Sequence, residues 1–432
     1  MDTKTLHEKF LECKQEIATD TRTMTPGCIF FAWKGEFHDG NTFADEAIEK
    51  GARYVVIDNP HFAKDERYLV VDDGMKALAR LATYHRRQFN VPVIAIGGSN
   101  GKTTSKELVA RVLGTQKDVV ASLGSENNHV GVPKTLLRMT RHTDIVVVEM
   151  GANHLGEIAD LCRIAEPTHG IITNIGRDHI GFFGGPGAIL EANLELYDYL
   201  RAHNGQVFVD VGDVLLSKYL EGLSHTSYGE GIGGEFGVNL ISGSPTLSFE
   251  WNKETITTHL AGAYNLQNVA AAIVIGRTFD IIPAHIVQAI VSYQPTNNRS
   301  QLIESEKGNL IIKDFYNANR TSMERALDNL RELATKHPDK ESIAILGDML
   351  ELGEYSMGEH QAAVDYAQEL GIHHIVLIGT EFQKTRHGES FFYINVDEAI
   401  AELQQSPIKN SVILLKASNG TNFQKLFDEV DW

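Results

Sequence analysis

Short apolar runs alternate with amphipathic stretches of helical spacing along most of the chain. From Val91 onward, the runs VPVIAIGG, DIVVVEMG and HGIITNIG are followed by expected helices at 104–114, 156–164 and about 186–202. Apolar strands separated by helices of this length predict a parallel, doubly wound sheet. Residues 206–260 switch to shorter alternating segments, which predict an antiparallel appendage, and an apolar helix is expected at 264–279.

Similar patterns on either side of this region predict two further α/β units. Residues 24–58 contain the apolar runs CIFFAW and RYVVID around a helical FADEAIEKG. The polar, proline-containing SYQPTNNRSQ predicts a linker near 293–298, after which strand and helix patterns resume. We therefore expect three α/β domains, at residues 1–88, 89–295 and 296–432.

Composition narrows the class of protein. The 432 residues are 42% hydrophobic and carry a net charge of -18, which argues against a nucleic-acid backbone as the main partner. The apolar runs are far shorter than the roughly 20 residues of a membrane span. The N-terminus has the mixed charges of an amphipathic helix rather than the pattern of a signal peptide, so we expect a cytoplasmic protein. Three scattered cysteines predict neither disulfides nor a zinc knuckle.

A glycine-rich loop lies between a predicted strand and a predicted helix. Its backbone N–H groups and the helix N-terminus would surround a phosphate, Lys102 would reach the phosphate charge, and Thr103 would offer a hydroxyl to Mg²⁺. Ile96 replaces the first glycine of the full Walker pattern, so this is a variant loop. The alternative is a glycine-rich turn without a ligand, which the flanking strand and helix disfavour. The loop residues are Gly98, Ser99, Asn100, Gly101, Lys102, Thr103 and Thr104.

Polar residues also follow the next strands. Glu149 ends IVVVE, and Asn174, Arg177, Asp178 and His179 follow GIIT. Ligands of a doubly wound sheet gather at the carboxyl ends of its strands, so Glu149 and His179 could complete a Mg²⁺ site. Glu149 alone would more often be a solvated loop charge. The cluster DFYNAN at 314–319 is either a third part of the site or an ordinary Asx-rich turn.

Taken together, these residues resemble the Mur ligase family, and the resemblance covers almost the whole chain. The phosphate loop GSNGKTT is similar to the family's own variant. The other blocks that resemble the family, in the family's order, are Asp20-Thr21-Arg22 with PGCIFFAWKGEFHDGNTF, NNHVGVPKTLL, EMGANHLGEI, AYNLQN, NNRSQ, DFYNANRTSM, ILGDMLELGEYSMGEH and LLKASNG.

The resemblance implies a fold and a reaction. It implies a small N-terminal α/β domain for a UDP-sugar, a central doubly wound P-loop ATPase domain and a C-terminal Rossmann-like α/β domain. In the implied reaction, ATP phosphorylates the terminal carboxylate of a UDP-N-acetylmuramoyl-peptide, and the amine of D-alanyl-D-alanine attacks the acyl phosphate. ATP and Mg²⁺ are the implied cofactors, and we expect a monomer.

The resemblance also implies residue roles. Lys102, Glu149 and His179 would be catalytic. Thr103, Glu149 and His179 would bind Mg²⁺. ATP would contact the loop from Gly98 to Thr104 together with Asn265, Asn268, Arg299 and Asp314. The substrates would contact Thr21, Arg22, Asn128, Tyr316, Asn317, Lys416 and Ser418.

Four positions depart from the family's pattern. Asn193 stands where the family commonly has a carbamylated lysine, and no lysine occurs between Lys134 and Lys218. An amide carries no charge, so a second metal would lose an anionic ligand unless Glu191 or Glu195 substitutes. The other departures are Gly181, Arg320 and Ala417. These changes leave two alternatives open: a diverged Mur-like paralogue with another substrate, and a nucleotide-binding pseudoenzyme.

Overall fold

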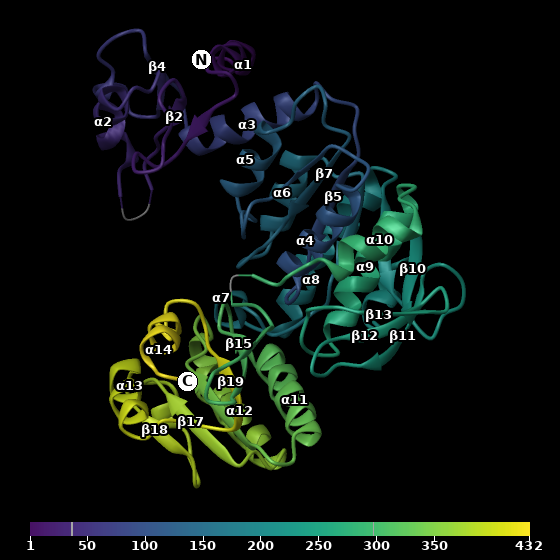
Figure 1. Cartoon of the computed structure of the whole chain (residues 1–432). Helices are drawn as coiled ribbons and strands as arrows, with labels where there is room; N and C mark the ends of the chain where they lie inside the picture. Colours follow the sequence, from purple (N-terminus) through teal and green to yellow (C-terminus); the bar gives the residue numbers. More distant parts are fainter. Residues whose placement is uncertain (36–37, 297) are drawn as a thin grey trace.

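The computed structural model describes residues 1–35, 38–296 and 298–432, over which the chain forms three sheets. Each sheet belongs to one α/β domain, and Figure 1 shows the three domains in chain order from purple to yellow. The three-domain α/β fold expected from the sequence is confirmed. The turn-rich GEFHDGN and the linker at 293–298 each include residues that lie outside the described ones.

The N-terminal domain has a parallel sheet of order β1-β2-β3-β4. Its strands are β1 (Ile17–Ala18), β2 (Ile29–Phe31), β3 (Tyr54–Ile57) and β4 (Tyr68–Val70). Its helices are α1 (Thr3–Glu12), α2 (Ala44–Glu49) and α3 (Gly74–Arg86). Helix α3 packs on α1 and also on α5 and α6 of the central domain, so it joins the two domains.

The central domain has a sheet of order β13-β12-β11-β10-β9-β8-β5-β7-β6 in the described residues. The strands are β5 (Val93–Gly97), β6 (Val119–Ala121), β7 (Ile145–Glu149), β8 (His169–Ile172), β9 (Gln206–Asp210), β10 (Ser224–Glu230), β11 (Gly237–Ser242), β12 (Ser248–Trp251) and β13 (Glu254–Thr257). The helices are α4 (Lys102–Leu113), α5 (Gly131–Leu137), α6 (Glu157–Ala165), α7 (Ile180–Phe183), α8 (Pro186–Ala202), α9 (Asn265–Thr278) and α10 (Pro283–Val291).

The predicted antiparallel appendage at 206–260 is only partly correct. Strands β9 and β10 continue the parallel sheet, and only β11, β12 and β13 pair antiparallel. The reason is that β9 follows helix α8 as one more strand-after-helix repeat, and its VFVD residues are buried like those of the other parallel strands.

Strand β5 shows why the phosphate loop has a rigid base. Val93 and Ala95 pack into the core with α6 and α8, whereas Ile94 and Ile96 pack into the core with α4 and α9. All four side chains are fully buried. A strand buried on both faces reads as an uninterrupted apolar run, which is the pattern of VIAI. The loop after β5 is therefore held from below by two hydrophobic cores.

The C-terminal domain has a sheet of order β14-β15-β19-β16-β17-β18, in which β14 is antiparallel to its neighbour and the other pairs are parallel. The strands are β14 (Gln301–Glu304), β15 (Leu310–Asp314), β16 (Glu341–Gly347), β17 (His374–Ile378), β18 (Phe391–Tyr393) and β19 (Ser411–Lys416). Helices α11 (Arg320–Lys336) and α12 (Ser356–Glu369) cover one face, and α13 (Val396–Gln405) and α14 (Phe423–Glu429) cover the other.

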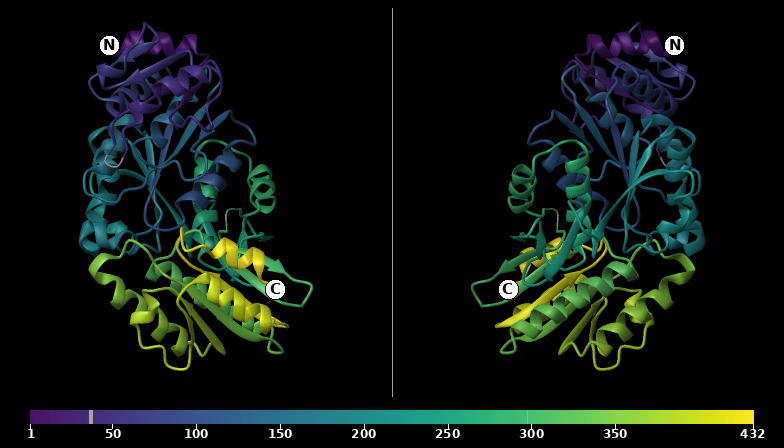
Figure 2. Two further views of the ribbon diagram at one scale, coloured as in Figure 1. Left: turned by 90° about the vertical axis from the view of Figure 1, so that its left-hand side faces the viewer. Right: turned by 90° about the vertical axis from the view of Figure 1, so that its right-hand side faces the viewer.

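The N-terminal and C-terminal domains lie at opposite ends of the central domain (Figure 2). The three cysteines, Cys13, Cys28 and Cys162, are free and buried, and burial raises the pKa of the Cys13 thiol to about 11. No helix within the described ranges has the length and apolar character needed to cross a membrane.

Candidate functional site

A polar cavity of about 390 Å³ lies at the carboxyl ends of the central strands β5, β7 and β8. Residues of the central domain form one wall and residues of the C-terminal domain form the other. Most of the sequence-predicted site residues line it: Ser99 to Thr104, Asn128, Glu149, His179, Asn265, Asn268, Arg299, Asp314, Tyr316, Asn317 and Lys416. The structure thus brings together residues that are more than 300 positions apart in the chain.

The phosphate loop joins the end of β5 to the start of α4. Gly98 and Gly101 have φ values of 110° and 85°, which favour glycine. Space enforces the same choice, because a Cβ atom on Gly98 would lie 2.3 Å from Thr173 Oγ1 and one on Gly101 would lie 2.5 Å from Asn268 Oδ1. The two glycines therefore let the loop pass between the segment that follows β8 and helix α9.

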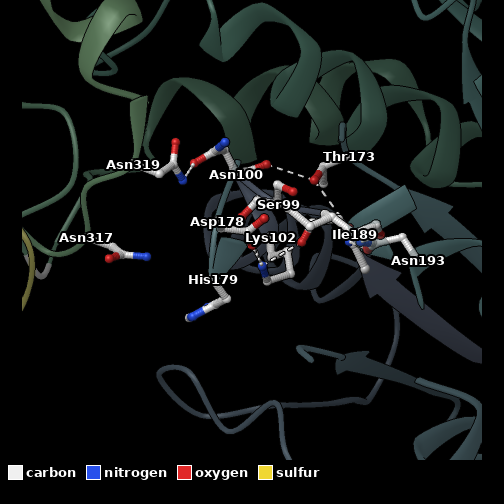
Figure 3. A network of polar contacts seen from close by, with 12 residues as sticks. Ser99, Asn100, Lys102, Thr173, Asp178, His179, Ile189, Asn193, Asn317 and Asn319 are labelled. Atoms are coloured by element: carbon white, nitrogen blue, oxygen red, sulfur yellow. Dashed lines mark hydrogen bonds and ion pairs between the residues drawn. The ribbon is translucent and has the colours of Figure 1, made fainter. Parts of the chain in front are cut away.

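Lys102 is folded onto its own loop. Its Nζ donates hydrogen bonds to Gly98 O at 2.6 Å and to Ser99 O at 3.0 Å. The same Nζ lies 3.8 Å from Oδ2 of Asp178, and Figure 3 shows this carboxylate beside the ammonium group. The sequence predicts Asp178 at a strand end and indicates no role for it. In the structure it is buried and lines the cavity.

Glu149, the last residue of β7, lies beside Thr103. Its Oε1 accepts hydrogen bonds from Thr103 Oγ1 at 3.2 Å and from Asn127 Nδ2 at 3.0 Å. Its Oε2 is buried and has no hydrogen-bond partner among the described residues. A buried carboxylate oxygen without a partner is unfavourable, so the pair Thr103 and Glu149 fits a cation such as Mg²⁺.

His179 lines the same cavity and contacts the C-terminal domain. It has a left-handed φ of 51°, its Nδ1 pairs with Glu351 of the C-terminal domain, and its ring is directed away from Lys102 in Figure 3. Within the described ranges no three His, Cys, Asp or Glu side chains converge as a metal site. The role of His179 as a Mg²⁺ ligand therefore stays a prediction, whereas its contact with the C-terminal domain is an observed one.

Asn193, the largest departure from the family pattern, lies outside the cavity lining and binds the backbone of the phosphate loop. It is buried on α8, its Oδ1 accepts a hydrogen bond from Gly98 N at 2.9 Å, and its Nδ2 donates to Ile189 O at 2.8 Å (Figure 3). Neither expected substitute lines the cavity. Glu195 accepts hydrogen bonds from Gly156 N and Ala159 N at 2.6 and 2.8 Å at the start of α6, and Glu191 is exposed.

The predicted adenine contacts are already bonded to each other. Asn268 Oδ1 accepts a hydrogen bond from Ser105 Oγ at 3.0 Å, and its Nδ2 donates to Asn265 Oδ1 at 2.9 Å. Asn265 Nδ2 donates to Ala261 O at 2.8 Å. These bonds tie α9 to α4 at the wall of the cavity, and the adenine role of the two residues stays a prediction.

Side chains from both domains meet across the cavity. Tyr316 and Ser125 share a hydrogen bond of 2.7 Å between their hydroxyl groups, and the Arg299 guanidinium lies 3.7 Å from the centre of the Tyr316 ring. Asn319 Nδ2 donates to Asn100 Oδ1 of the phosphate loop at 2.9 Å (Figure 3). The C-terminal domain therefore touches the phosphate loop directly.

An ion pair between the buried Lys416 and the partly buried Asp314 holds the C-terminal wall. Lys416 Nζ lies 2.9 Å from Asp314 Oδ2 and donates a hydrogen bond to Asn317 O at 2.6 Å. Asp314 Oδ1 in turn accepts a hydrogen bond from Ser300 N at 3.2 Å. Lys416 and Asp314 satisfy each other in this arrangement, which fixes the strand ends of β15 and β19 side by side.

Other predicted residues lie outside the cavity lining. Thr21 and Arg22 belong to the N-terminal domain, where Arg22 pairs with Asp20 at 2.7 Å. Ser418 accepts a hydrogen bond from Leu350 N at 3.0 Å. Gly181, Arg320 and Ala417, three of the departures, do not line the cavity either.

Two cations near the cavity were missed by sequence reasoning. Lys106 is buried and donates to Ser122 O at 2.9 Å and Gly124 O at 2.7 Å, which holds the loop that carries Ser125. Burial lowers the pKa of Lys106. Arg325 on α11 lines the cavity, and burial lowers its pKa as well. The sequence does not mark either residue as part of a site, because both fit the ordinary pattern of an amphipathic helix.

The chain matches three family models. They are the Mur ligase family catalytic domain over residues 15–86, the Mur ligase middle domain over residues 96–276 and the Mur ligase glutamate ligase domain over residues 298–419.

Similar individual proteins are known. The UDP-N-acetylmuramoyl-tripeptide–D-alanyl-D-alanine ligase of Bacillus subtilis is 32% identical, over 96% of this chain and 92% of that protein. A crystal structure of MurF from Acinetobacter baumannii has a TM-score of 0.82 at 29% identity, covering 96% of this chain and 93% of that one. The MurF ligase of Thermotoga maritima, solved with ADP, shares the fold with a TM-score of 0.83 at 24% identity, covering 97% of both chains.

Proposed function

Because the chain belongs to the Mur ligase family, we propose that it is an ATP-dependent ligase that joins D-alanyl-D-alanine to UDP-N-acetylmuramoyl-tripeptide in peptidoglycan precursor synthesis. The names of its relatives support this activity. The observation that carries the proposal is the shared cavity, in which a phosphate loop from one domain faces Arg299, Asp314 and Lys416 from the next.

The proposed reaction has two steps. The terminal carboxylate of the tripeptide attacks the γ-phosphorus of ATP, so a C–O–P bond forms and ADP leaves. The amine of D-alanyl-D-alanine then attacks the acyl carbon and loses a proton, an amide bond forms, and the acyl C–O bond breaks as phosphate leaves. Negative charge gathers on the transferred phosphoryl group, and the backbone N–H groups of the loop and the ammonium of Lys102 are placed to stabilise it.

Lys102 must exchange partners in this scheme. Its bonds to Gly98 O and Ser99 O hold it at the loop before a phosphate is present. Thr103 and Glu149 would hold Mg²⁺, which supplies positive charge to the phosphate oxygens. The acyl phosphate needs protection from water, and the contacts of Tyr316 with Ser125 and of Asn319 with Asn100 would cover it.

The remaining assignments follow from the proposed reaction. Residues 1–88 would bind the UDP-sugar through Thr21 and Arg22, residues 89–295 would bind ATP, and residues 296–432 would bind the dipeptide near Lys416 and Ser418. Asn128 would face the tripeptide. We propose that the chain acts as a monomer in the cytoplasm, where ATP is available.

Phosphate release tests the proposed function. The chain is incubated with ATP and Mg²⁺, and UDP-N-acetylmuramoyl-tripeptide and D-alanyl-D-alanine are added singly or together. The mass of the product is measured by mass spectrometry. We expect release only with both substrates, together with the mass of the pentapeptide product. Lys102→Ala should abolish release, whereas Lys117→Ala, which removes the same charge from an exposed site, should not. ATP binding without release under any of these conditions would favour the pseudoenzyme alternative.

A further inference from the structure

Two buried carboxylate oxygens in the cavity have no partner within the described chain. They are Oδ1 of Asp178 and Oε2 of Glu149, and their residues are 6% and 1% exposed. Both residues line the cavity beside the phosphate loop. Buried ionised oxygens are strongly unfavourable unless they are paired or bind a metal. Each carboxylate therefore has one oxygen free to bind a cation that enters the cavity.

Lys102 does not fill that role for Asp178. Its Nζ is 3.8 Å from Asp178 Oδ2, which is longer than a hydrogen bond, and its donors are directed at Gly98 O and Ser99 O. The other oxygen of Asp178 is the unpaired one. A bound phosphate would also attract Lys102. The negative charge of Asp178 would then have less positive charge beside it than in the present arrangement.

The backbone holds Asp178 in this place firmly. A Cβ atom on Gly176 would lie 2.7 Å from Asn100 Nδ2 and 3.0 Å from Ser99 Cβ, so the segment before Asp178 is pressed against the phosphate loop. On the next residue, the Arg177 guanidinium binds both carboxylate oxygens of Glu359, at 2.5 and 3.1 Å. The backbone that carries Asp178 is therefore held beside the phosphate loop.

Adding a nucleotide makes the charge problem larger. Its phosphates would enter a cavity that already holds the carboxylates of Asp178 and Glu149. Like charges that lie close together repel strongly when they are shielded from water. Mg²⁺ resolves this repulsion, because it is commonly bound by one or two carboxylates together with phosphate oxygens and water.

We propose that Asp178 is a ligand of the Mg²⁺ that accompanies the nucleotide, in addition to Thr103 and Glu149. Asp178 faces Lys102 while no phosphate is present and turns its charge to the metal when the nucleotide enters. This role rests on the proposed function only for the identity of the nucleotide. It gives the site an anionic ligand that does not depend on residue 193.

Mn²⁺ binding in the presence of ADP tests the proposal. Free Mn²⁺ is followed by electron paramagnetic resonance during titration of the full chain, and ADP affinity is measured by calorimetry with Mn²⁺ and with a chelator. In Asp178→Asn, we expect Mn²⁺ affinity in the ADP complex to fall roughly 10- to 100-fold. Metal-free ADP should bind this variant as well as, or better than, the parent chain, because a repelling charge is gone.

The control is Asp198→Asn, which removes an equally charged carboxylate from the exposed side of α8 and should leave Mn²⁺ affinity unchanged. Asp178→Ser serves if the Asn variant does not fold, as judged by circular dichroism. Unchanged Mn²⁺ affinity, with ADP binding strengthened equally with and without metal, would overturn the proposal and leave Asp178 as a partner of Lys102 alone. A parent chain that binds Mn²⁺ and ADP through Asp178 but makes no pentapeptide would overturn only the proposed function.

Discussion

Asn193 holds the first N–H group of the phosphate loop from a helix 95 residues further along the chain. Asn193→Ala would leave Gly98 N buried without an acceptor, which costs about 1–3 kcal/mol. If half of that loss appears as disorder of the loop, the dissociation constant for ATP rises about 2- to 13-fold. Calorimetry with ATP measures the change, and Asn90→Ala, at an exposed position, is the control.

Asn193→Lys should weaken ATP binding too, since an ammonium group cannot accept the hydrogen bond from Gly98 N. A gain of ligase activity in this variant on addition of bicarbonate would contradict the supporting role of Asn193. It would instead mean that a carbamate at this position can reach the cavity.

The residues whose chemistry the sequence indicates without a fold or a family resemblance are those that lie within one loop. The run from Gly98 to Thr104 is contiguous, so its chemistry could be predicted without knowing the fold. The roles of Asp178 and Asn127 could not, because they depend on the order β8-β5-β7, which places three separate loops at one edge of the sheet. In the sequence, Asn193 stands out only as a missing lysine, because its bond to Gly98 depends on the packing of α8 against the loop.

At the scale of elements, α1 is fastened to α3 by two buried histidines. His7 Nε2 and His85 Nδ1 are 3.0 Å apart, and His85 Nε2 is 3.0 Å from Met139 O. Two neutral rings satisfy this geometry, with His85 donating to the carbonyl and accepting from His7. Burial lowers the pKa of both rings, and for His85 the nearby His7 lowers it further against the opposing effect of the Met139 carbonyl.

The histidine pair makes stability depend on pH. Because the folded pKa values lie below the unfolded value of 6.5, the unfolded chain binds more protons as the pH falls through that value. The stabilisation is fully present above pH 6.5 and is lost below it. We expect the Tm to fall between pH 7.5 and 5.5, and to fall less in His85→Gln, whose amide can both donate and accept. Equal slopes for the parent, His85→Gln and the exposed control His61→Gln would contradict this account.

Which elements could be predicted depended on their burial and length. Helix α8 was predicted with its observed bounds at 186–202, because a 17-residue amphipathic pattern leaves little ambiguity. The short helices α5 and α7 were not predicted, since α5 contains Pro133 and α7 has four residues. Strand β10 has the polar sequence SHTSYGE, so its pairing with β9 comes from the sheet rather than from local preference.

At the scale of the whole molecule, Gly181 makes a close backbone contact with the C-terminal domain. Its N–H donates to Glu351 O at 3.1 Å, and a Cβ atom there would lie 2.5 Å from both Gly353 N and Leu352 C. The neighbouring pair of Arg177 and Glu359 joins the same two domains. An acidic side chain at position 181, which the family pattern suggests, has no room in this arrangement.

Gly181→Ala should push the C-terminal domain away from the phosphate loop. Overpacking of this kind costs about 1–3 kcal/mol, so we expect ligase activity to fall roughly 10-fold and the radius of gyration in X-ray scattering to increase. Gly187→Ala is the matched control, because a Cβ atom at Gly187 meets nothing within 4 Å. Full activity and an unchanged radius of gyration in Gly181→Ala would mean that the two domains are not in contact at Gly181 during catalysis.

The buried thiols can be used to measure how often each domain opens. Cys13 and Cys28 lie in the N-terminal core and Cys162 lies in the central core, and burial raises the pKa of all three. A thiol in this state reacts with an alkylating reagent only when the surrounding core opens. The rate at which each cysteine is alkylated therefore reports how often its own domain unfolds, and comparing the rates with and without nucleotide separates ligand effects on the two domains.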